Sequence, residues 1–289
     1  MKLFYRTILL ILSLTPFATA HDASSYKATL TYKAYWAGFT VANITSETII
    51  NNDQYQISAH YEVGGFARMF SKSANKTLSR GIQIENGEYR PTYYESSGNF
   101  GRLTYLNQAK FDPVSLKVTE HVQELNLRDD LEYIPIAEEE KYGADPLSIF
   151  LNMTMNENFN EDYKVLDTQR QFGGIFVSEQ YFVCEERVVM EHESRSVFEG
   201  EATVCAIDGK RLAGNIKRLN PKKKRKKSRV DDDQKTRIWF GKLAGFQAMA
   251  PVYTEFSIGW GKVRIYLSDY KVEPIEAIEL GIIKAENSN

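Results

Sequence analysis

The sequence predicts a mainly β protein, in which a single curved antiparallel sheet forms an open or closed barrel-like wrap around one central helix. Alternating apolar and polar runs separated by turn residues occupy most of the 289 residues, as in barrels and sandwiches. One segment has strong helical spacing instead, and it is apolar over most of its circumference. Such a helix must be covered on several sides, so strands have to supply the cover.

The predicted helix runs from Asp145 to Met155. Asp145 is suited to capping because its carboxylate accepts backbone N–H groups, and Pro146 fits the first helical position, where no N–H partner is lost. The apolar residues that then recur at helical spacing are Leu147, Phe150, Leu151 and Met155. About three turns are too few to form a stable helix alone in water, so packing must hold it.

The strand from Tyr26 to Trp36 has the clearest alternation in the chain. Its apolar side is led by Tyr26, Leu30, Tyr32 and Trp36, and its other side carries lysine and threonine. Further strands are expected at Phe39–Ile50, Tyr55–Val63, Thr77–Ser79, Ile82–Ile84, Tyr89–Ser96, Arg102–Leu106, Ala109–Phe111, Leu116–Leu125, Tyr163–Leu166, Arg237–Phe240, Val252–Ile258 and Lys262–Ser268.

The first twenty residues have the features of a secretory signal peptide. A basic start, a short apolar run from Thr7 to Phe17 and small residues before Ala20 predict cleavage after Ala20 and a periplasmic protein. No later segment is long and apolar enough to cross a bilayer, so the protein is not expected to span the membrane. The remainder is expected to be a single β-barrel-like domain over residues 21–274 and a tail over 275–289.

Two cysteines in an exported chain suggest one disulfide. If Ile175–Met190 and Val197–Ile207 pair symmetrically about Ser194-Arg195, Cys184 faces Cys205 across the ladder. A turn at Glu199-Gly200 is an equally sensible alternative and would put the cysteines out of register. The oxidising compartment favours the bond, with a structural role because no Cys-x-x-Cys motif is present.

Catalytic signatures are not evident, so we expect no enzyme, no catalytic residues, no metal site and no cofactor. The sequence has neither a Gly-x-Ser-x-Gly elbow nor a phosphate-binding glycine loop. A weaker alternative is a copper site at His21, the new amino terminus, completed by His60, His121 or His192.

An apolar ligand or lipid moiety is the favoured partner. We expect Tyr26, Leu30, Tyr32 and Trp36 to line its site on the curved sheet, with Phe66 and Phe70 lining a mouth, although a loop packed on the core explains those two phenylalanines as well.

A basic run, Lys222 to Lys227 with Arg229, is followed at once by three aspartates. Export argues against nucleic acid, and a solvated loop explains the run best. The alternative function is a structural envelope module that binds another protein or the cell wall, with this loop as its contact.

Several stretches together resemble the bacterial exported domain-of-unknown-function family 3108. They are Tyr26-x5-Tyr32-x3-Trp36-x-Gly38-Phe39, Arg102 to Asp112, Asp145-Pro-Leu-Ser148, Ile238-Trp-Phe240, Ala250-Pro-Val252 and the last strands to Leu267. Ala42, where the family usually has glycine, the basic insert and the tail after Pro274 depart from the pattern. The resemblance implies an exported barrel-like sheet with a helix against it, and no assigned activity.

Overall fold

The computed structural model describes most of the chain beyond the predicted signal peptide. The signal peptide, His21, Phe70, the basic run and most of the tail lie outside the described residues, and so does the predicted strand Tyr163–Leu166. No described helix is long and apolar enough to cross a membrane. The described residues are 25–69, 72–100, 103–155, 168–219, 236–258 and 261–275.

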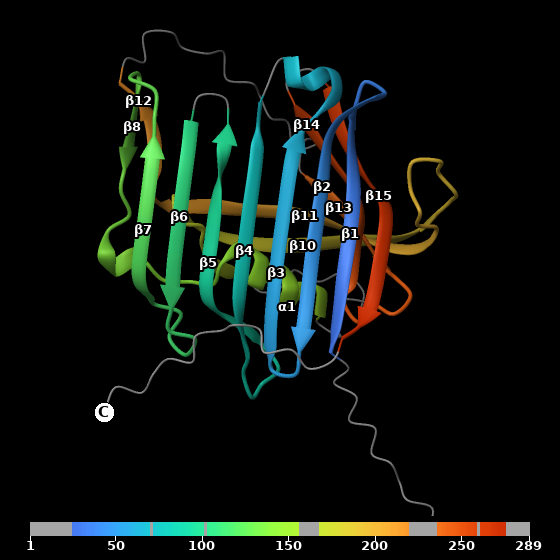
Figure 1. The fold of residues 1–289 in the computed structure, drawn as a ribbon, viewed down its shortest axis with the longest axis horizontal. Helices are drawn as coiled ribbons and strands as arrows, with labels where there is room; N and C mark the ends of the chain where they lie inside the picture. The colour runs from blue at the N-terminus through green and yellow to red at the C-terminus, as the bar shows by residue number, and fades with distance from the viewer. Residues whose placement is uncertain are drawn as a thin grey trace, which may run out of the picture.

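Thirteen strands form one antiparallel sheet, in which strands from the two ends of the chain are neighbours (Figure 1). The prediction of a mainly β protein with one α-helix holds for the described residues. The sheet is not closed into a barrel. Its order is β7 (Val118–Asn126), β6 (Leu103–Phe111), β5 (Tyr89–Phe100), β4 (Ala74–Gln83), β3 (Gln54–Val63), β2 (Phe39–Asn51), β1 (Tyr26–Trp36), β15 (Gly261–Pro274), β14 (Met249–Ile258), β13 (Arg237–Lys242), β11 (Gly200–Ala213), β10 (Val177–Met190) and β9 (Gln169–Phe172).

Four short elements lie outside this sheet. Their bounds are η1 (Gly65–Met69), η2 (Glu138–Glu140), and β8 (Leu131–Ile134) with β12 (Asn215–Arg218), which pair as a separate two-stranded sheet.

Two predicted strand breaks are wrong. Thr77–Ser79 and the first two residues of Ile82–Ile84 belong to the single strand β4. The described part of Arg102–Leu106, which starts at Leu103, and Ala109–Phe111 belong to the single strand β6. Gly81 does not end β4, because it allows a close strand pairing: a Cβ there would lie 2.0 Å from the Arg90 carbonyl oxygen.

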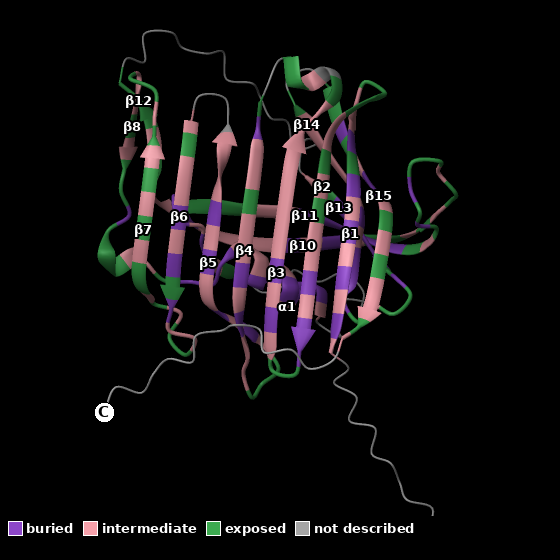
Figure 2. Ribbon diagram, viewed as in Figure 1, coloured by how far each residue is buried: buried purple, intermediate pink, exposed green. Residues whose placement is uncertain are grey.

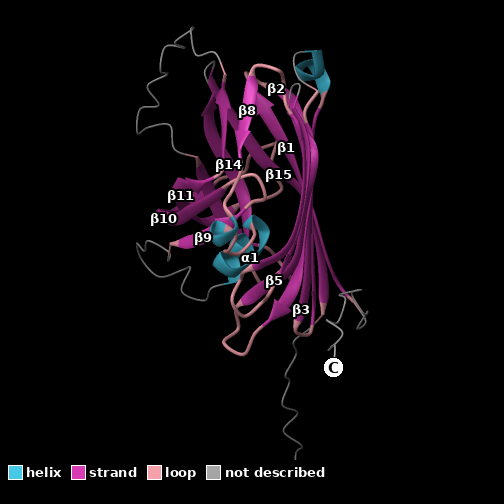
Figure 3. Ribbon diagram, turned by 90° about the vertical axis from the view of Figure 1, so that its left-hand side faces the viewer, coloured by secondary structure: helices cyan, strands magenta, loops and turns pink. Residues whose placement is uncertain are grey.

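The sheet folds over into two layers with the helix α1 (Pro146–Met155) between them (Figures 1 and 3). Strands β1 to β7 form the broad layer, and β9 to β11 cross behind it. The helix begins at Pro146 as predicted, and its backbone is capped by Asp145, which accepts the N–H groups of Leu147 at 2.8 Å and Ser148 at 3.2 Å.

The two faces of the broad layer differ in charge. Residues opposite each other on neighbouring strands share a face, so the register sorts every side chain. Tyr26 and Ala28 are buried on the inner face, whereas Lys27 points outward to bind Glu47 at 2.6 Å. Followed across the ladders, every Asp, Glu, Lys and Arg of β1 to β7 falls on the outer face.

The helix covers only part of the inner face. Ile149, Leu151 and Met153 are buried. Leu151 packs with residues of β1, β2, β3 and β5, and Met153 packs with residues of β10, β11, β13 and β14. Figure 2 shows the buried parts of β1 to β6 concentrated toward the end of the sheet where α1 lies, and partly exposed residues toward the other end. The inner face therefore has a covered, apolar half and a less covered half.

A short strap, residues 140–144, touches both free edges of the sheet. On the β7 side the Val118 N–H donates to the Lys141 carbonyl at 3.0 Å. On the β9 side the Phe172 N–H donates to the Ala144 carbonyl at 2.9 Å. Arg170 of β9 adds a hydrogen bond to the Tyr142 carbonyl and lies 3.8 Å from the centre of the Tyr142 ring. The open sheet is thus tied across its gap by the strap.

The predicted disulfide is present between Cys184 and Cys205, which face each other on β10 and β11. The pairing is the one centred on Ser194-Arg195, so the alternative turn at Glu199-Gly200 is wrong. Both cysteines are buried beside Met153 of α1. The bond therefore fixes the hairpin against which the helix packs.

We expect Cys184→Ala with Cys205→Ala to lower the free energy of unfolding by about 3 kcal/mol, since the bond closes a loop of moderate length in the unfolded chain. Urea unfolding of the oxidised protein and of this variant measures the difference. Adding reductant to the variant is the control and should change nothing. Equal urea midpoints for the oxidised protein and the variant would show that the disulfide does not contribute to the stability of the fold.

Gly143 tests the strap. Its φ is +121°, and a Cβ there would lie 2.5 Å from the Arg170 carbonyl oxygen. Gly38 is the matched control, because its φ is +87° and a Cβ added to it would meet no atom within 4 Å. We expect Gly38→Ala to cost about 1 kcal/mol from backbone strain alone, and Gly143→Ala at least about 2 kcal/mol more. If thermal unfolding shows similar losses of stability for the two variants, the strap accommodates the added methyl group without an energetic cost.

Candidate functional site

The apolar stripe predicted to line a ligand site lies mostly in the protein core. Leu30 and Tyr32 are buried against Phe198, and Tyr26 packs on Phe246 with ring centres 5.9 Å apart. Trp36 is half-buried at the end of β1. Phe66 lies in η1, but its side chain and the whole of Phe70 are outside the described residues. The structure therefore gathers three of the six residues, and their contact with a ligand stays a prediction.

Two of these core tyrosines have unusual hydroxyl groups. The hydroxyls of Tyr26 and Tyr32 are buried and have no hydrogen-bond partner in the described part of the chain. Burial raises the pKa of both phenols above the usual 10, so both stay protonated.

A cleft of about 600 Å³ opens between the two layers, beside the start of α1. Its lining comes from both layers and from the helix: Tyr94 of β5 and Pro146 of α1 on one side, and residues of β9 to β11 on the other. Those residues include Gln171, Ser178, Gln180, Ile207 and Gly209. Two smaller hollows, of about 330 and 360 Å³, lie at the β10–β11 hairpin and across β2 to β5.

The cleft combines uncharged polar groups with four charged residues, which are Glu179, Asp208, Lys210 and Arg211. Gln180 alternates with Phe182 and Cys184, which face α1, so it points between the layers. The buried Oε1 atom of Gln171 has no hydrogen-bond partner among the described residues. Glu179 and Lys210, which also line the cleft, bind each other at 2.9 Å and are partly exposed. Arg211 lies opposite Ser178 on the same face and is exposed, so a ligand would meet amides, hydroxyls and apolar groups together with one guanidinium.

A row of hydroxyls and amides continues from Tyr94 along the less covered half of the inner face. Ser96 follows Tyr94 on the same face of β5 and accepts from the Asn75 amide at 3.3 Å. The Thr77 hydroxyl donates to the side-chain Oδ1 atom of Asn75 at 2.7 Å, and the Asn75 side-chain amide also donates to the Tyr105 hydroxyl. This row contains no charged side chain and begins at the cleft residue Tyr94.

A buried carboxyl organises the helix end that borders the cleft. Asp145 is fully buried and accepts hydrogen bonds from the hydroxyls of Ser148 and, at 2.8 Å, Ser79. The Tyr55 hydroxyl lies 2.5 Å from the Ser148 oxygen and 3.2 Å from the Ser79 oxygen. Three elements, β3, β4 and α1, therefore meet at one carboxyl group.

Burial raises the pKa of Asp145 above the usual 3.8, and the hydrogen bonds from Ser148 and Ser79 oppose that rise. Burial likewise raises the pKa of Tyr55, with a further increase from the nearby Asp145. A serine, a carboxyl and a tyrosine side by side suggest chemistry. However, Tyr55, Ser79, Asp145 and Ser148 are fully buried. The group is therefore structural in this conformation.

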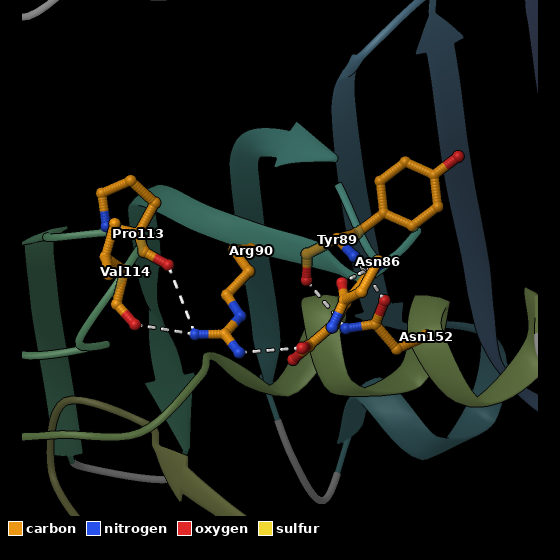
Figure 4. A network of polar contacts seen from close by, with 7 residues as sticks. Asn86, Tyr89, Arg90, Pro113, Val114 and Asn152 are labelled. Atoms are coloured by element: carbon orange, nitrogen blue, oxygen red, sulfur yellow. Dashed lines mark hydrogen bonds and ion pairs between the residues drawn. The ribbon is translucent and has the colours of Figure 1, made fainter. Parts of the chain in front are cut away.

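The other half of the helix is held by an amide clamp (Figure 4). Asn152 accepts from the Tyr89 N–H and donates to the Tyr89 carbonyl, each at 2.7 Å. The next residue, Arg90, points the other way and donates to the Val114 carbonyl at 2.9 Å. The start of β5 thus fixes α1 and the β6–β7 turn together, which holds the cleft wall in place.

The histidines give no metal cluster in the described part of the structure. His60, His121 and His192 lie on β3, on β7 and in the β10–β11 connection. His121 packs on Phe172 with ring centres 5.2 Å apart, and burial lowers its pKa. The copper alternative depends on His21, which is outside the described residues.

The cleft residues escaped the sequence analysis. Gln180 and Ser178 stand at alternate positions of the strand expected at Ile175–Met190, and that polar alternation was the available signal. No signal in the sequence marked Tyr94 or Gln171, because β5 and β9 come close together only when the sheet folds over.

No family model, curated protein or solved structure matched the chain, so the family resemblance stays a prediction and function has to be argued from the geometry.

The pH dependence of stability tests the buried carboxyl. A native pKa above the unfolded value means that Asp145 contributes most below about pH 4 and that this contribution is lost as the pH rises through the native pKa. Asp145→Asn keeps the capping oxygen and does not titrate. We expect wild type to lose stability relative to this variant as the pH rises from 4 to 7 in urea unfolding.

The difference in unfolding free energy between the two proteins removes the contributions of other titrating groups such as His121, which are the same in both. A flat difference from pH 4 to 7 would mean that the carboxyl is ionised with an ordinary pKa.

Proposed function

We propose that this chain is an exported, non-enzymatic binding protein that holds an apolar ligand or lipid moiety with a polar end in the cleft between its layers. The cleft carries the proposal: its volume of about 600 Å³ falls within the range of small-molecule sites. Tyr94 in its lining adjoins the uncharged row on the inner face, so a ligand longer than the cleft would continue along Ser96 and Asn75.

The polar groups of the cleft set the ligand class. A charged group placed away from Arg211 would lose its hydration without finding an opposite charge, at a cost of several kcal/mol. Amides such as Gln171 and Gln180 instead bind hydroxyl, ester or amide groups. Apolar parts of the ligand would contact Tyr94 and Ile207.

Export supports the same proposal. The disulfide between Cys184 and Cys205 fits an oxidising compartment, and the basic, apolar and small-residue order of residues 1–20 fits a signal peptide. A carrier between the membranes of the envelope needs no catalytic group. The polar group around Asp145 is fully buried, so a substrate would not reach it in this conformation.

A second candidate is an envelope module that pairs with an extended segment of another protein. Strand β7 favours it, because it lies at the edge of the sheet and Val122 on it is exposed. The charged neighbours Glu120 and Glu124 are also the usual protection of an edge strand against pairing. The cleft is therefore the better-supported site.

Filling the cleft tests the first proposal. Gln180→Trp places a bulky ring between the layers, while Tyr181→Trp, on the opposite face of β10, is the matched control. We expect Gln180→Trp to weaken binding of a fluorescent fatty acid at least about tenfold, since the ring would occupy the ligand volume. The control should bind like wild type.

Solvent extraction of the purified wild-type protein, followed by mass spectrometry, identifies what it carries. A wild-type protein that carries nothing and takes up no fluorescent fatty acid would rule out the carrier and leave the envelope module.

A further inference from the structure

Arg211 carries a positive charge on the side of β11 that faces the cleft. Successive side chains of a strand point to opposite faces, and residues opposite each other on paired strands share a face. Arg211 lies opposite Ser178, and Gly209 lies opposite Gln180, so these four residues face the cleft together. The other charged residues of the lining stand at the intervening positions and point to the opposite face: Glu179, Asp208 and Lys210.

The charges on the opposite face have partners of their own. Glu179 and Lys210 bind each other at 2.9 Å, and the Asp208 carboxylate accepts the Gly209 N–H at 2.7 Å. The contacts of Arg211 within the described ranges include an aromatic ring and an amide but no carboxylate. One guanidinium charge is therefore left without a described counter-charge on the cleft side of the hairpin.

The two neutral contacts hold the Arg211 side chain in place. Its guanidinium carbon lies 4.0 Å from the centre of the Phe176 ring, which also lines the cleft, and its Nη1 atom donates to Asn215 Oδ1 at 3.1 Å. An aromatic ring and an amide fix a guanidinium without cancelling its charge. The remaining N–H groups of Arg211 are thus positioned for an acceptor that enters the cleft.

The apolar part of the lining is more enclosed than Arg211. Tyr94 is buried and Ile207 is half-buried beside the cluster that contains Met153 of α1, whereas Arg211 is exposed. A ligand would bury its apolar chain against Tyr94 and Ile207 and keep its head group beside Arg211. An anion there would retain part of its hydration, so its desolvation would cost less than in the interior.

We propose that Arg211 selects an apolar ligand that ends in a carboxylate. This inference rests on the proposed function and deepens it, because it names the head group of the ligand that the cleft would hold. The planar fork of N–H groups on a guanidinium matches the two oxygens of a carboxylate, and such charge-assisted hydrogen bonds are stronger than neutral ones.

The balance of charge around the cleft favours a single negative charge on the ligand. The lining has two acidic and two basic residues, and only Arg211 of the basic pair faces inward. A phosphate monoester carries a charge of about −1.5 to −2 at pH 7. It would therefore keep uncompensated negative charge close to Glu179 and Asp208, whereas a carboxylate would be neutralised by Arg211.

The test compares three ligands with the same twelve-carbon chain. Laurate, dodecanol and dodecyl phosphate each displace the neutral dye N-phenyl-1-naphthylamine from the purified, delipidated full chain. The variant is Arg211→Gln. The matched control is Lys210→Gln, which makes the same change in net charge at the neighbouring position on the opposite face.

We expect Arg211→Gln to lower the ratio of laurate affinity to dodecanol affinity at least about fivefold, a moderate effect because Arg211 is exposed. Dodecanol affinity should stay within about twofold of wild type, which excludes general damage to the cleft. Lys210→Gln should keep the wild-type ratio, and wild type should bind laurate more tightly than dodecyl phosphate. Added salt should weaken laurate binding to wild type more than to Arg211→Gln.

The possible failures of this inference and of the proposed function differ. An unchanged ratio in Arg211→Gln, an equal fall in Lys210→Gln, or tighter wild-type binding of dodecyl phosphate than of laurate would overturn the role of Arg211 and leave the cleft as a ligand site. A wild-type protein that binds none of the three ligands would overturn the proposed function and this inference with it. Gln180→Trp, which fills the cleft, should weaken laurate and dodecanol binding alike.

Discussion

The buried carboxyl of Asp145 is the interaction on which the arrangement of the two layers depends. It accepts hydrogen bonds from Ser79 on β4 and Ser148 on α1, and Tyr55 on β3 joins the same group. A buried carboxyl without such partners would be strongly unfavourable. The carboxyl finds these hydrogen-bond partners at one position of the helix start. At other positions along the apolar inner face it would have no such partners.

That constraint reaches the free edges of the sheet, because the strap ends where Asp145 begins. Residues 140–144 bond β7 on one side and β9 on the other, and the helix follows directly. Cap, strap and helix thus act as one unit. Pro146, the first residue of this unit beyond Asp145, is also a wall of the cleft, so the same hydrogen bonds that fix the helix define the shape of the proposed ligand site.

Local signals predicted the parts of this fold that local chemistry determines. Asp145-Pro146 marks a helix start by itself, Tyr26–Trp36 alternates along one strand, and Cys184 and Cys205 lie on one hairpin. The partners of the carboxyl were out of reach, because Ser79 lies 66 residues before Asp145 in the chain and only tertiary packing brings them together. Short strands such as β9 are also too brief to show a period.

The open edge explains why a core this apolar leaves room for a ligand. Direct pairing of β7 with β9 would close the sheet and bring their inner faces together around a filled interior. The strap stands between them instead and is bonded to both, so the edges remain apart while their backbone groups find partners there. Gln171, which borders the strap through Ala144, lines the cleft with a buried amide oxygen that no described residue satisfies. The open sheet therefore leaves a space of molecular size between the layers, and Gln171 is part of its lining.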